Sequence, residues 1–260
     1  MRILFFGDVV GWPGRQAVKE QTRKLREEFR AGLVIANGEN SAGGSGLTHQ
    51  TASELFDAGV DVITTGDHVW DQRETATLLQ NDSRILRPLN YPAGTPGRGS
   101  MIWQGEHQPT VAVMNLQGRS FMPPLENPFV AAQAEVERLR QVTKLIFVDF
   151  HAEATSEKIA LARFLDGKVT AVIGTHTHVQ TADEQVFPGG TAYLSDAGFT
   201  GPHESVLGRE IEPVVRKFLT GLPQKFDVAT ADVRLHGVFV EAEDATGKAV
   251  RIQRLAVRLG

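Results

Sequence analysis

Short runs of consecutive apolar residues alternate with longer amphipathic stretches along most of the chain. Strands that are buried on both faces of a sheet read as such apolar runs, and their alternation with helical stretches is typical of a parallel sheet. We therefore predict an α/β fold whose sheet is mostly parallel. The predicted strands cover residues 2–6, 33–36, 60–64, 111–115, 145–150 and 169–173.

The stretches between these strands have helical periodicity and end at residues that terminate helices. Asp71 and Glu74 are interpreted as the N-cap and N3 residues of one helix, and Thr155 as the N-cap of another. Residues 88–100 and 121–128 contain several prolines, which predicts loops. The predicted helices cover residues 16–30, 49–58, 72–80, 130–142 and 156–165.

The last third of the chain has a different pattern. Residues 228–240 and 249–257 are rich in β-branched side chains, and Thr246-Gly247 between them suits a turn. We expect an antiparallel hairpin here, in a second sheet. The chain contains no linker that would separate two domains, so residues 1–260 are expected to form a single domain.

Composition excludes several classes of protein. The chain has 27 basic and 31 acidic residues and no basic block, which argues against a general nucleic-acid or membrane-surface binder. No apolar run exceeds four residues, which excludes a transmembrane helix and makes the start too short for a secretory signal. Because there is no cysteine, any metal must be held by oxygen and nitrogen ligands. We expect a cytoplasmic enzyme without a membrane partner.

Residues that can bind metal ions follow five of the predicted strands. Open α/β sheets bind ligands at the carboxyl ends of their strands, so these side chains are expected to converge on one edge. Four of the eight histidines are among them. The candidate residues are Asp8, Glu39, Asn40, Asp67, His68, His151, His176 and His178.

Each candidate also has an ordinary structural interpretation. Asp8 and Asp67 could be turn or cap residues, Glu39-Asn40 could belong to a glycine-rich turn, and His151 could be a core histidine. The pair His176 and His178 is more specific, because two imidazoles two residues apart in an extended segment project from the same side. Independent turn residues need not converge on one edge, so the whole pattern predicts a metal centre.

Five segments of the chain resemble the calcineurin-like metallophosphoesterases, and in order and spacing they resemble the YmdB-like branch of bacterial cyclic-nucleotide phosphodiesterases. The segments are residues 6–11 (FGDVVG), 37–40 (NGEN), 150–158 (FHAEATSEK), 174–178 (GTHTH) and 201–208 (GPHESVLG). The resemblance implies a four-layer α/β/β/α sandwich with two packed mixed sheets. It also implies hydrolysis of phosphodiesters such as 2',3'-cyclic nucleotides.

The resemblance further implies two metal ions per chain, iron or manganese, with zinc as an alternative. One ion would be held by Asp8, Asn40 and His178. The other would be held by Asp67, His151 and His176, with Glu39 bridging both and His68 acting as general acid. Three positions depart from the patterns that the resemblance leads us to expect. Val10 replaces the histidine of the superfamily's Asp-x-His motif, Glu39 replaces a bridging aspartate, and Asp67 stands where we expect asparagine.

Two divalent ions can activate a water for attack on phosphorus, and a histidine can protonate the leaving alkoxide. The expected partner is a small phosphodiester, and a homo-oligomer is compatible with the sequence. Two other classes of function stay open. One is a phosphomonoesterase or another metal hydrolase. The other is a regulatory protein that binds a nucleotide or RNA at the same metal site.

Several neighbouring residues have weaker claims to a role. Asp71 could orient His68, but the N-cap interpretation is preferred. Glu153 could bind a ligand imidazole or simply begin a helix. His203 and Arg119 could contact substrate, but an exposed loop histidine and a surface arginine are the preferred interpretations. Glycines 43, 44 and 46 lack the Lys-Ser/Thr continuation of a P-loop and are expected to give backbone clearance beside the metals.

Overall fold

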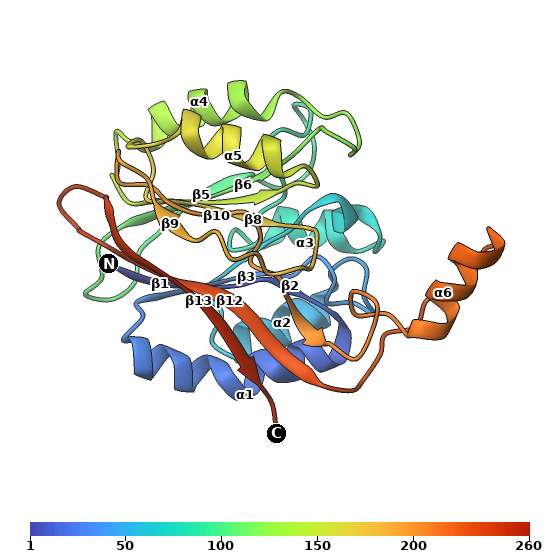
Figure 1. Cartoon of the computed structure of the whole chain (residues 1–260). Helices are drawn as coiled ribbons and strands as arrows, with labels where there is room; N and C mark the ends of the chain where they lie inside the picture. Colours follow the sequence, from blue (N-terminus) through green and yellow to red (C-terminus); the bar gives the residue numbers. More distant parts are fainter.

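The computed structural model describes residues 1–260 and consists of four layers (Figure 1). Two β-sheets pack face to face in the middle. Helices α1 (Gly11–Phe29) and α2 (His49–Asp57) cover the outer face of one sheet, and α4 (Pro128–Leu139) and α5 (Thr155–Phe164) cover the outer face of the other. The predicted α/β/β/α sandwich is therefore confirmed. No helix is both long and apolar enough to span a membrane.

The first sheet has seven strands in the order β2-β11-β12-β1-β3-β4, with β13 beside β12. Strands β1, β3 and β4 are parallel, while β12 runs antiparallel to β1, β11 and β13. The strands are β1 (Arg2–Phe6), β2 (Asp8–Val9), β3 (Leu33–Asn37), β4 (Val62–Thr64), β11 (Phe199–Pro202), β12 (Val233–Ala242) and β13 (Ala249–Arg258).

The second sheet has six strands in the order β5-β6-β7-β8-β10-β9. Strands β6, β7, β8 and β10 are parallel, and the two edge strands are antiparallel to their neighbours. The strands are β5 (Ser100–Trp103), β6 (Val111–Gln117), β7 (Ile146–His151), β8 (Ala171–Thr175), β9 (Gln185–Val186) and β10 (Ala192–Leu194).

Apolar side chains from the facing surfaces of the two sheets form the central core. Phe5 of β1 and Phe147 of β7 meet there with ring centroids 5.3 Å apart, among buried aliphatic residues of both sheets. Each sheet needs this contact because its inner face is apolar. The packing fixes the two sheets relative to each other, and their parallel strands end on the same side of the molecule.

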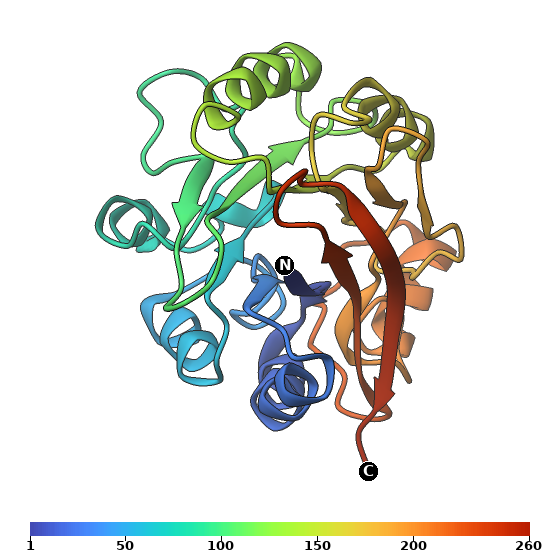
Figure 2. The ribbon, with the colours of Figure 1, turned by 90° about the vertical axis from the view of Figure 1, so that its left-hand side faces the viewer.

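The C-terminal hairpin joins the first sheet, so the prediction that it lies in a second sheet was wrong. Its strand β12 pairs with β1, with Phe5 opposite Val238. In Figure 2 the hairpin runs beside the N-terminal strand, and helices lie around the rim. The first sheet thus combines the start and the end of the chain, which sequence periodicity alone does not reveal.

Helix α1 begins at Gly11, five residues before the predicted start. Gly11 has a positive φ of 59°, which turns the chain out of β2, and Pro13 fits the first helical turn because no partner is needed for its missing N–H. Gly14 lets the helix approach β11, since a Cβ there would lie 2.4 Å from the carbonyl oxygen of Thr200. These glycines, which resemble helix breakers in the sequence, therefore lie inside the helix.

Two predicted helix caps were wrong. Helix α3 (Thr75–Asn81) has Glu74 at its N-cap without a side-chain bond, and the Glu74 carboxylate instead accepts from the backbone N–H of His49. Thr155 is the first residue of α5, and Ala154 is its N-cap. Asp71 lies beyond reach of the helix because a 3₁₀ turn, η1 (Asp67–Trp70), brings it back toward His68.

Candidate metal centre

The candidate residues come from the carboxyl ends of strands in both sheets, and not from one sheet as predicted. The first sheet places Asp8 in β2, Glu39 and Asn40 after β3, and the 3₁₀ turn η1 after β4. The second sheet places His151 at the end of β7 and His176 just after β8. Because the sheets are packed together, the site forms where the two sets of strand ends meet.

Four of the candidates form a tight cluster. Their ligand atoms all lie within 4.8 Å of one another. The Nε2 of His151 lies 3.0 Å from Asp67 Oδ1 and 3.1 Å from Glu39 Oε1, and 3.1 Å from His176 Nδ1. Two carboxylates and two imidazoles are ligands for a first-row transition metal. The cluster consists of Glu39, Asp67, His151 and His176.

A second group lies on the other side of Glu39. Asp8 is completely buried, and its Oδ1 has no hydrogen-bond partner. This oxygen lies 3.8 Å from His178 Nε2. The amide nitrogen of Asn40 lies 3.2 Å from the same His178 nitrogen, and a half-turn of the amide would place its oxygen there. A buried carboxylate oxygen without a donor is costly, so this group of residues fits a cation.

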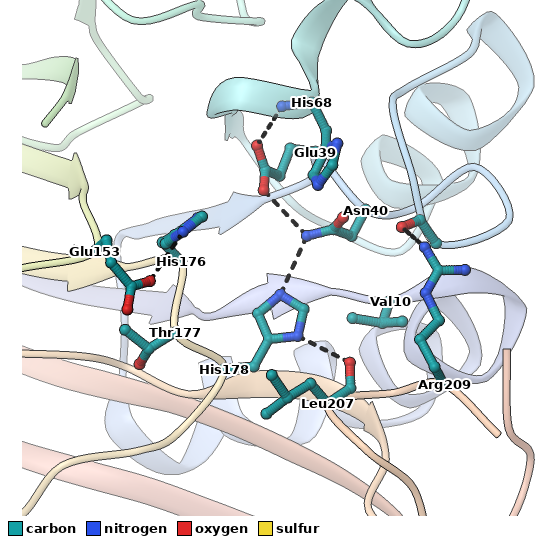
Figure 3. A pocket seen from close by; sticks show the side chains of 11 residues that line it. Val10, Glu39, Asn40, His68, Glu153, His176, Thr177, His178, Leu207 and Arg209 are labelled. Carbon is teal, nitrogen blue, oxygen red and sulfur yellow. Dashed lines mark hydrogen bonds and ion pairs between the residues drawn. The ribbon is translucent and has the colours of Figure 1, made fainter. Parts of the chain in front are cut away.

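Glu39 lies between the two groups and contacts both (Figure 3). Its Oε1 is 3.1 Å from His151 Nε2 and 3.1 Å from the amide nitrogen of Asn40, while Oε2 accepts from the backbone N–H of His68. Burial would raise the pKa of Glu39, but the positive charge of His151 outweighs it and lowers the pKa. Glu39 is therefore an anion placed between two sets of ligands.

Thr175 and Asp149 set the tautomer of His151. The Nδ1 of His151 lies 2.9 Å from the hydroxyl of Thr175, which donates to Asp149 Oδ1 at 2.7 Å. Since the hydroxyl proton is used on Asp149, Thr175 accepts from the Nδ1–H. In the neutral form of His151, Nε2 then carries the lone pair that can bind a metal. Burial raises the pKa of Asp149 to about 7.

The segment that carries His176 and His178 is not extended, contrary to prediction. Both residues have positive φ angles, 102° and 64°, which are uncommon and strained for non-glycine residues. Thr177 between them donates from its N–H and its hydroxyl to Asp196 Oδ2. The same oxygen binds Lys158 Nζ at 2.8 Å, and both side chains of this ion pair are only 1% exposed. The buried pair therefore holds the strained segment in place.

Replacing Asp196 with Asn is expected to lower the free energy of unfolding by about 3–5 kcal/mol, because Lys158 is left buried without a counter-charge. Urea denaturation measures the change. The matched control is Arg23→Ala, which removes an ion pair whose two side chains are both well exposed, and its unfolding midpoint should not move. Equal midpoints for the two variants would show that the buried pair does not hold the segment.

His68 lies on η1 at the rim of the site, with its Nδ1 2.8 Å from Asp71 Oδ2. Asp71 therefore orients His68, and the preferred N-cap interpretation was wrong. Partial burial would lower the pKa of His68, but Glu39 and Asp67, together with the bond to Asp71, outweigh it and raise the pKa. When cations neutralise Glu39 and Asp67, Asp71 is the partner that still raises the pKa of His68.

A cavity of about 350 Å³ opens over these residues. Arg209 is the one arginine or lysine in its wall and was not predicted, although it directly follows the motif 201–208. Its guanidinium donates to the carbonyl oxygens of Gly43, Gly44 and Phe226. A Cβ on Gly44 would lie 2.4 Å from this guanidinium, so the glycine-rich segment gives clearance to Arg209. The wall consists of Val10, Glu39, Asn40, Gly44, His68, Glu153, His176, Thr177, His178, Leu207 and Arg209.

The residues with weaker claims have different environments. Glu153 Oε2 lies 3.1 Å from His176 Nε2, so it contacts a candidate imidazole. Arg119 lies outside the cavity wall, beside Glu157. His203 also lies outside the wall, but it is half-buried and stacks on Phe199 at 4.2 Å, so the prediction of an exposed loop histidine was wrong. Phe199 in turn stacks on His178.

Known proteins resemble this chain over nearly its whole length. A family model described as "YmdB-like protein" matches residues 4–255. A 2',3'-cyclic-nucleotide 2'-phosphodiesterase of Bacillus subtilis is 47% identical over 99% of this chain and 97% of its own. A putative phosphatase/phosphodiesterase of Mycoplasma genitalium is 36% identical over 100% of this chain and 94% of its own.

Two solved structures have the same fold throughout. A hypothetical protein from Thermus thermophilus superimposes with a TM-score of 0.93 at 42% identity, covering 99% of both chains. A novel phosphatase from Mycoplasma pneumoniae also superimposes with a TM-score of 0.93, at 35% identity, covering 99% of this chain and 93% of its own. The arrangement of strands around the site is thus shared with two solved structures, one of which is described as a phosphatase.

Proposed function

The chain belongs to the YmdB-like protein family, and on that premise we propose that it is a metal-dependent phosphodiesterase acting on 2',3'-cyclic nucleotides. The observation that carries the proposal is the convergence of two ligand groups on Glu39, one of which contains the unpartnered oxygen of Asp8. The 47% identity to the Bacillus subtilis phosphodiesterase supports the choice of substrate.

We propose two divalent metal ions per chain. Asp8, Asn40 and His178 would hold one ion, and Asp67, His151 and His176 the other, with Glu39 shared between them. Oxygen and imidazole ligands suit iron or manganese, with zinc as the alternative. Asp67 adds a carboxylate where the family resemblance leads us to expect asparagine, and this extra charge should strengthen the hold on the second ion.

Ions in this site would supply an activated water and neutralise charge on the phosphate. The chain itself supplies the proton for the leaving oxygen. Asp71 accepts from Nδ1 of His68, which leaves Nε2 as the nitrogen that donates to the leaving ribose alkoxide. The bond to Asp71 favours the protonated form of the His68 imidazole, which is the form that a general acid needs.

Replacing Asp71 with Asn should move the alkaline limb of the pH–rate profile to lower pH. The charge of Asp71 contributes to the raised pKa of His68, so its removal lowers that pKa. As a general acid, His68 is active when protonated, and its activity is lost as the pH rises through its pKa. The measurement is kcat/KM against pH for a 2',3'-cyclic nucleotide. An alkaline limb that stays in place would show that His68 is not the acid.

A phosphomonoesterase is the second candidate, because one Mycoplasma relative is described as a phosphatase and the other as a putative phosphatase/phosphodiesterase. The charges in the cavity favour the diester. Glu153 lies in its wall and is not among the proposed ligands. A diester carries one negative charge and a monoester two near neutral pH, so Glu153 opposes the monoester more strongly.

The experiment compares bis(p-nitrophenyl) phosphate with p-nitrophenyl phosphate on the metal-loaded protein. We expect higher kcat/KM for the diester, and we expect 2',3'-cyclic AMP to give the 3'-phosphate. Higher kcat/KM for the monoester would favour the phosphomonoesterase instead. Binding of nucleotide without turnover of any ester would favour the regulatory protein. We propose further that residues 1–260 act as one domain, in the cytoplasm.

A further inference from the structure

The glycine-rich loop (residues 42–46) follows the proposed ligands of β3 and lies beside the cavity. The backbone N–H of Ala42 donates to the carbonyl oxygen of Gly46, and that of Ser45 donates to the carbonyl oxygen of Ala42. The three glycines of the loop have positive φ angles of 65°, 88° and 81°, which glycine adopts without strain. Because glycine also leaves the chain flexible, the loop needs contacts from outside to keep one shape.

Arg209, which follows β11, holds one side of the glycine-rich loop. Its Nη1 donates at 3.1 Å to the carbonyl oxygen of Gly43 and at 3.1 Å to that of Phe226. Its Nη2 donates to the carbonyl oxygen of Gly44. A guanidinium can make these bonds together because its donors form a rigid planar fork. Arg209 therefore ties the loop to the segment that precedes β12.

The other side of the glycine-rich loop contacts the turn η1 through Ser45. The Ser45 hydroxyl donates to Asp71 Oδ2, and its Oγ lies 3.3 Å from His68 Nδ1. The side-chain amide of Gln72 donates to the Ser45 carbonyl oxygen at 2.8 Å. Since His68 Nδ1 also lies 2.8 Å from Asp71 Oδ2, one carboxylate oxygen binds both the hydroxyl and the imidazole. Arg209 and His68 line different parts of the cavity wall (Figure 3), and the loop connects them.

The contact between His68 and Asp71 is weak by itself. Both side chains are 43% exposed, and exposed pairs contribute little because water competes and both side chains lose rotamer freedom. The Ser45 hydroxyl adds a second bond to the same oxygen, which restricts the rotation of Asp71. Placement matters at this position, because a general acid must lie within hydrogen-bond reach of the oxygen that it protonates.

We propose that Ser45 and Arg209 are positioning residues for the general acid. Arg209 keeps the glycine-rich loop in one shape, and the loop places the Ser45 hydroxyl on Asp71. Asp71 then holds the His68 imidazole toward the leaving oxygen. The inference rests on the proposed function, in which His68 protonates that oxygen. Arg209 acts through the carbonyl oxygens of the loop and not through its charge on the phosphate.

The first test removes the hydroxyl. Ser45→Ala is expected to lower kcat on 2',3'-cyclic AMP by about 10–100-fold at unchanged KM, because the acid is misplaced while the phosphate is bound as before. The loss should be much smaller for bis(p-nitrophenyl) phosphate, and Ser45→Thr, which retains a hydroxyl, should restore the rate. The matched control is Ser53→Ala, which removes a hydroxyl bonded to the exposed Asp57 and should leave kcat unchanged.

The same substitution in the His68→Ala background separates positioning from a general structural role. If Ser45 acts only through His68, adding Ser45→Ala to the His68→Ala variant lowers its rate no further, so the two effects are not additive. A further loss as large as that of Ser45→Ala alone would overturn the proposal.

The second test replaces Arg209 with Lys, which retains the positive charge but not the fork of donors. We expect kcat on 2',3'-cyclic AMP to fall as it does in Ser45→Ala. We also expect the backbone N–H groups of Ala42 and Ser45 to exchange faster with deuterium than in the unmodified protein, because the loop opens more often. Full activity or unchanged exchange in Arg209→Lys would overturn the role of Arg209.

The unmodified protein in the same assay separates this inference from the proposed function. Turnover of 2',3'-cyclic AMP by the unmodified protein, together with full activity of Ser45→Ala, would overturn the positioning role alone. Absence of turnover by the metal-loaded unmodified protein would overturn both.

Discussion

Replacing His176 with Ala is expected to remove metal from the site and abolish nearly all hydrolysis. His176 Nδ1 lies 3.1 Å from His151 Nε2 and 3.3 Å from Asp67 Oδ1, so its removal opens the tightest cluster of the site. Loss of a residue in the shell around a metal ligand costs about 10–100-fold in metal affinity or activity, and loss of a ligand should cost more. Elemental analysis and kcat/KM for 2',3'-cyclic AMP measure the two effects.

The control for this variant is His107→Ala, which removes an almost fully exposed histidine outside the site. It should keep full metal content and full activity. Full metal occupancy in the His176 variant would contradict the ligand assignment. A variant that loses metal yet hydrolyses the ester at the normal rate would contradict the role of metal in the reaction.

Replacing His68 with Ala is expected to keep both metal ions and lower the rate on a cyclic nucleotide by about 10²–10⁴-fold. A ribose alkoxide is a poor leaving group and needs a proton, whereas p-nitrophenolate hardly needs one. The loss should therefore be much smaller for bis(p-nitrophenyl) phosphate. Single-substrate kinetics with both esters, on protein of measured metal content, separate the two cases.

An equal loss for good and poor leaving groups would argue that His68 positions the substrate and does not donate a proton. Loss of metal in the His68 variant would give His68 a structural role at the centre. Asp71 acts through its bond to His68. We therefore expect the Asp71→Asn variant, like the His68 variant, to lose less activity on bis(p-nitrophenyl) phosphate than on the cyclic nucleotide.

The central strands could be predicted because they are buried on both faces and therefore consist of consecutive apolar residues. Strand β3, for example, is buried at every position from Leu33 to Asn37. Strands β9 and β10 were missed because they contain two and three residues, too few to show a pattern. Helix α6 (Ile211–Thr220) was missed although its apolar residues recur at helical spacing, because it follows residues 201–208, whose glycines and proline suggest neither a helix nor a strand.

The candidate ligands could be predicted because they follow predicted strands, and the structure brings them together. The sequence could not reveal how they are held. His176 and His178 have positive φ angles, and Thr177 between them is held by Asp196, whose carboxylate is paired with the distant Lys158. No sequence pattern pointed to Arg209, because its guanidinium binds the carbonyl oxygen of Gly43, which lies more than a hundred residues away in the chain.

Asp71 illustrates how a local rule can mislead. Asp71 and Glu74 have the spacing of an N-cap pair, but the 3₁₀ turn after β4 directs Asp71 toward His68 and delays the helix to Thr75. The bond between Asp71 and His68 replaces the capping bond. Departures of this kind are expected where a residue serves a site and not its own helix.

Titration of the metal-free protein with Mn²⁺, while hydrolysis of 2',3'-cyclic AMP is followed, tests the central claim most directly. We predict no turnover before metal is added, and a rise that reaches its plateau at two ions per chain with the 3'-phosphate as product. Turnover that persists in the metal-free protein, or a plateau at one ion per chain, would contradict a centre formed by two ligand groups around Glu39.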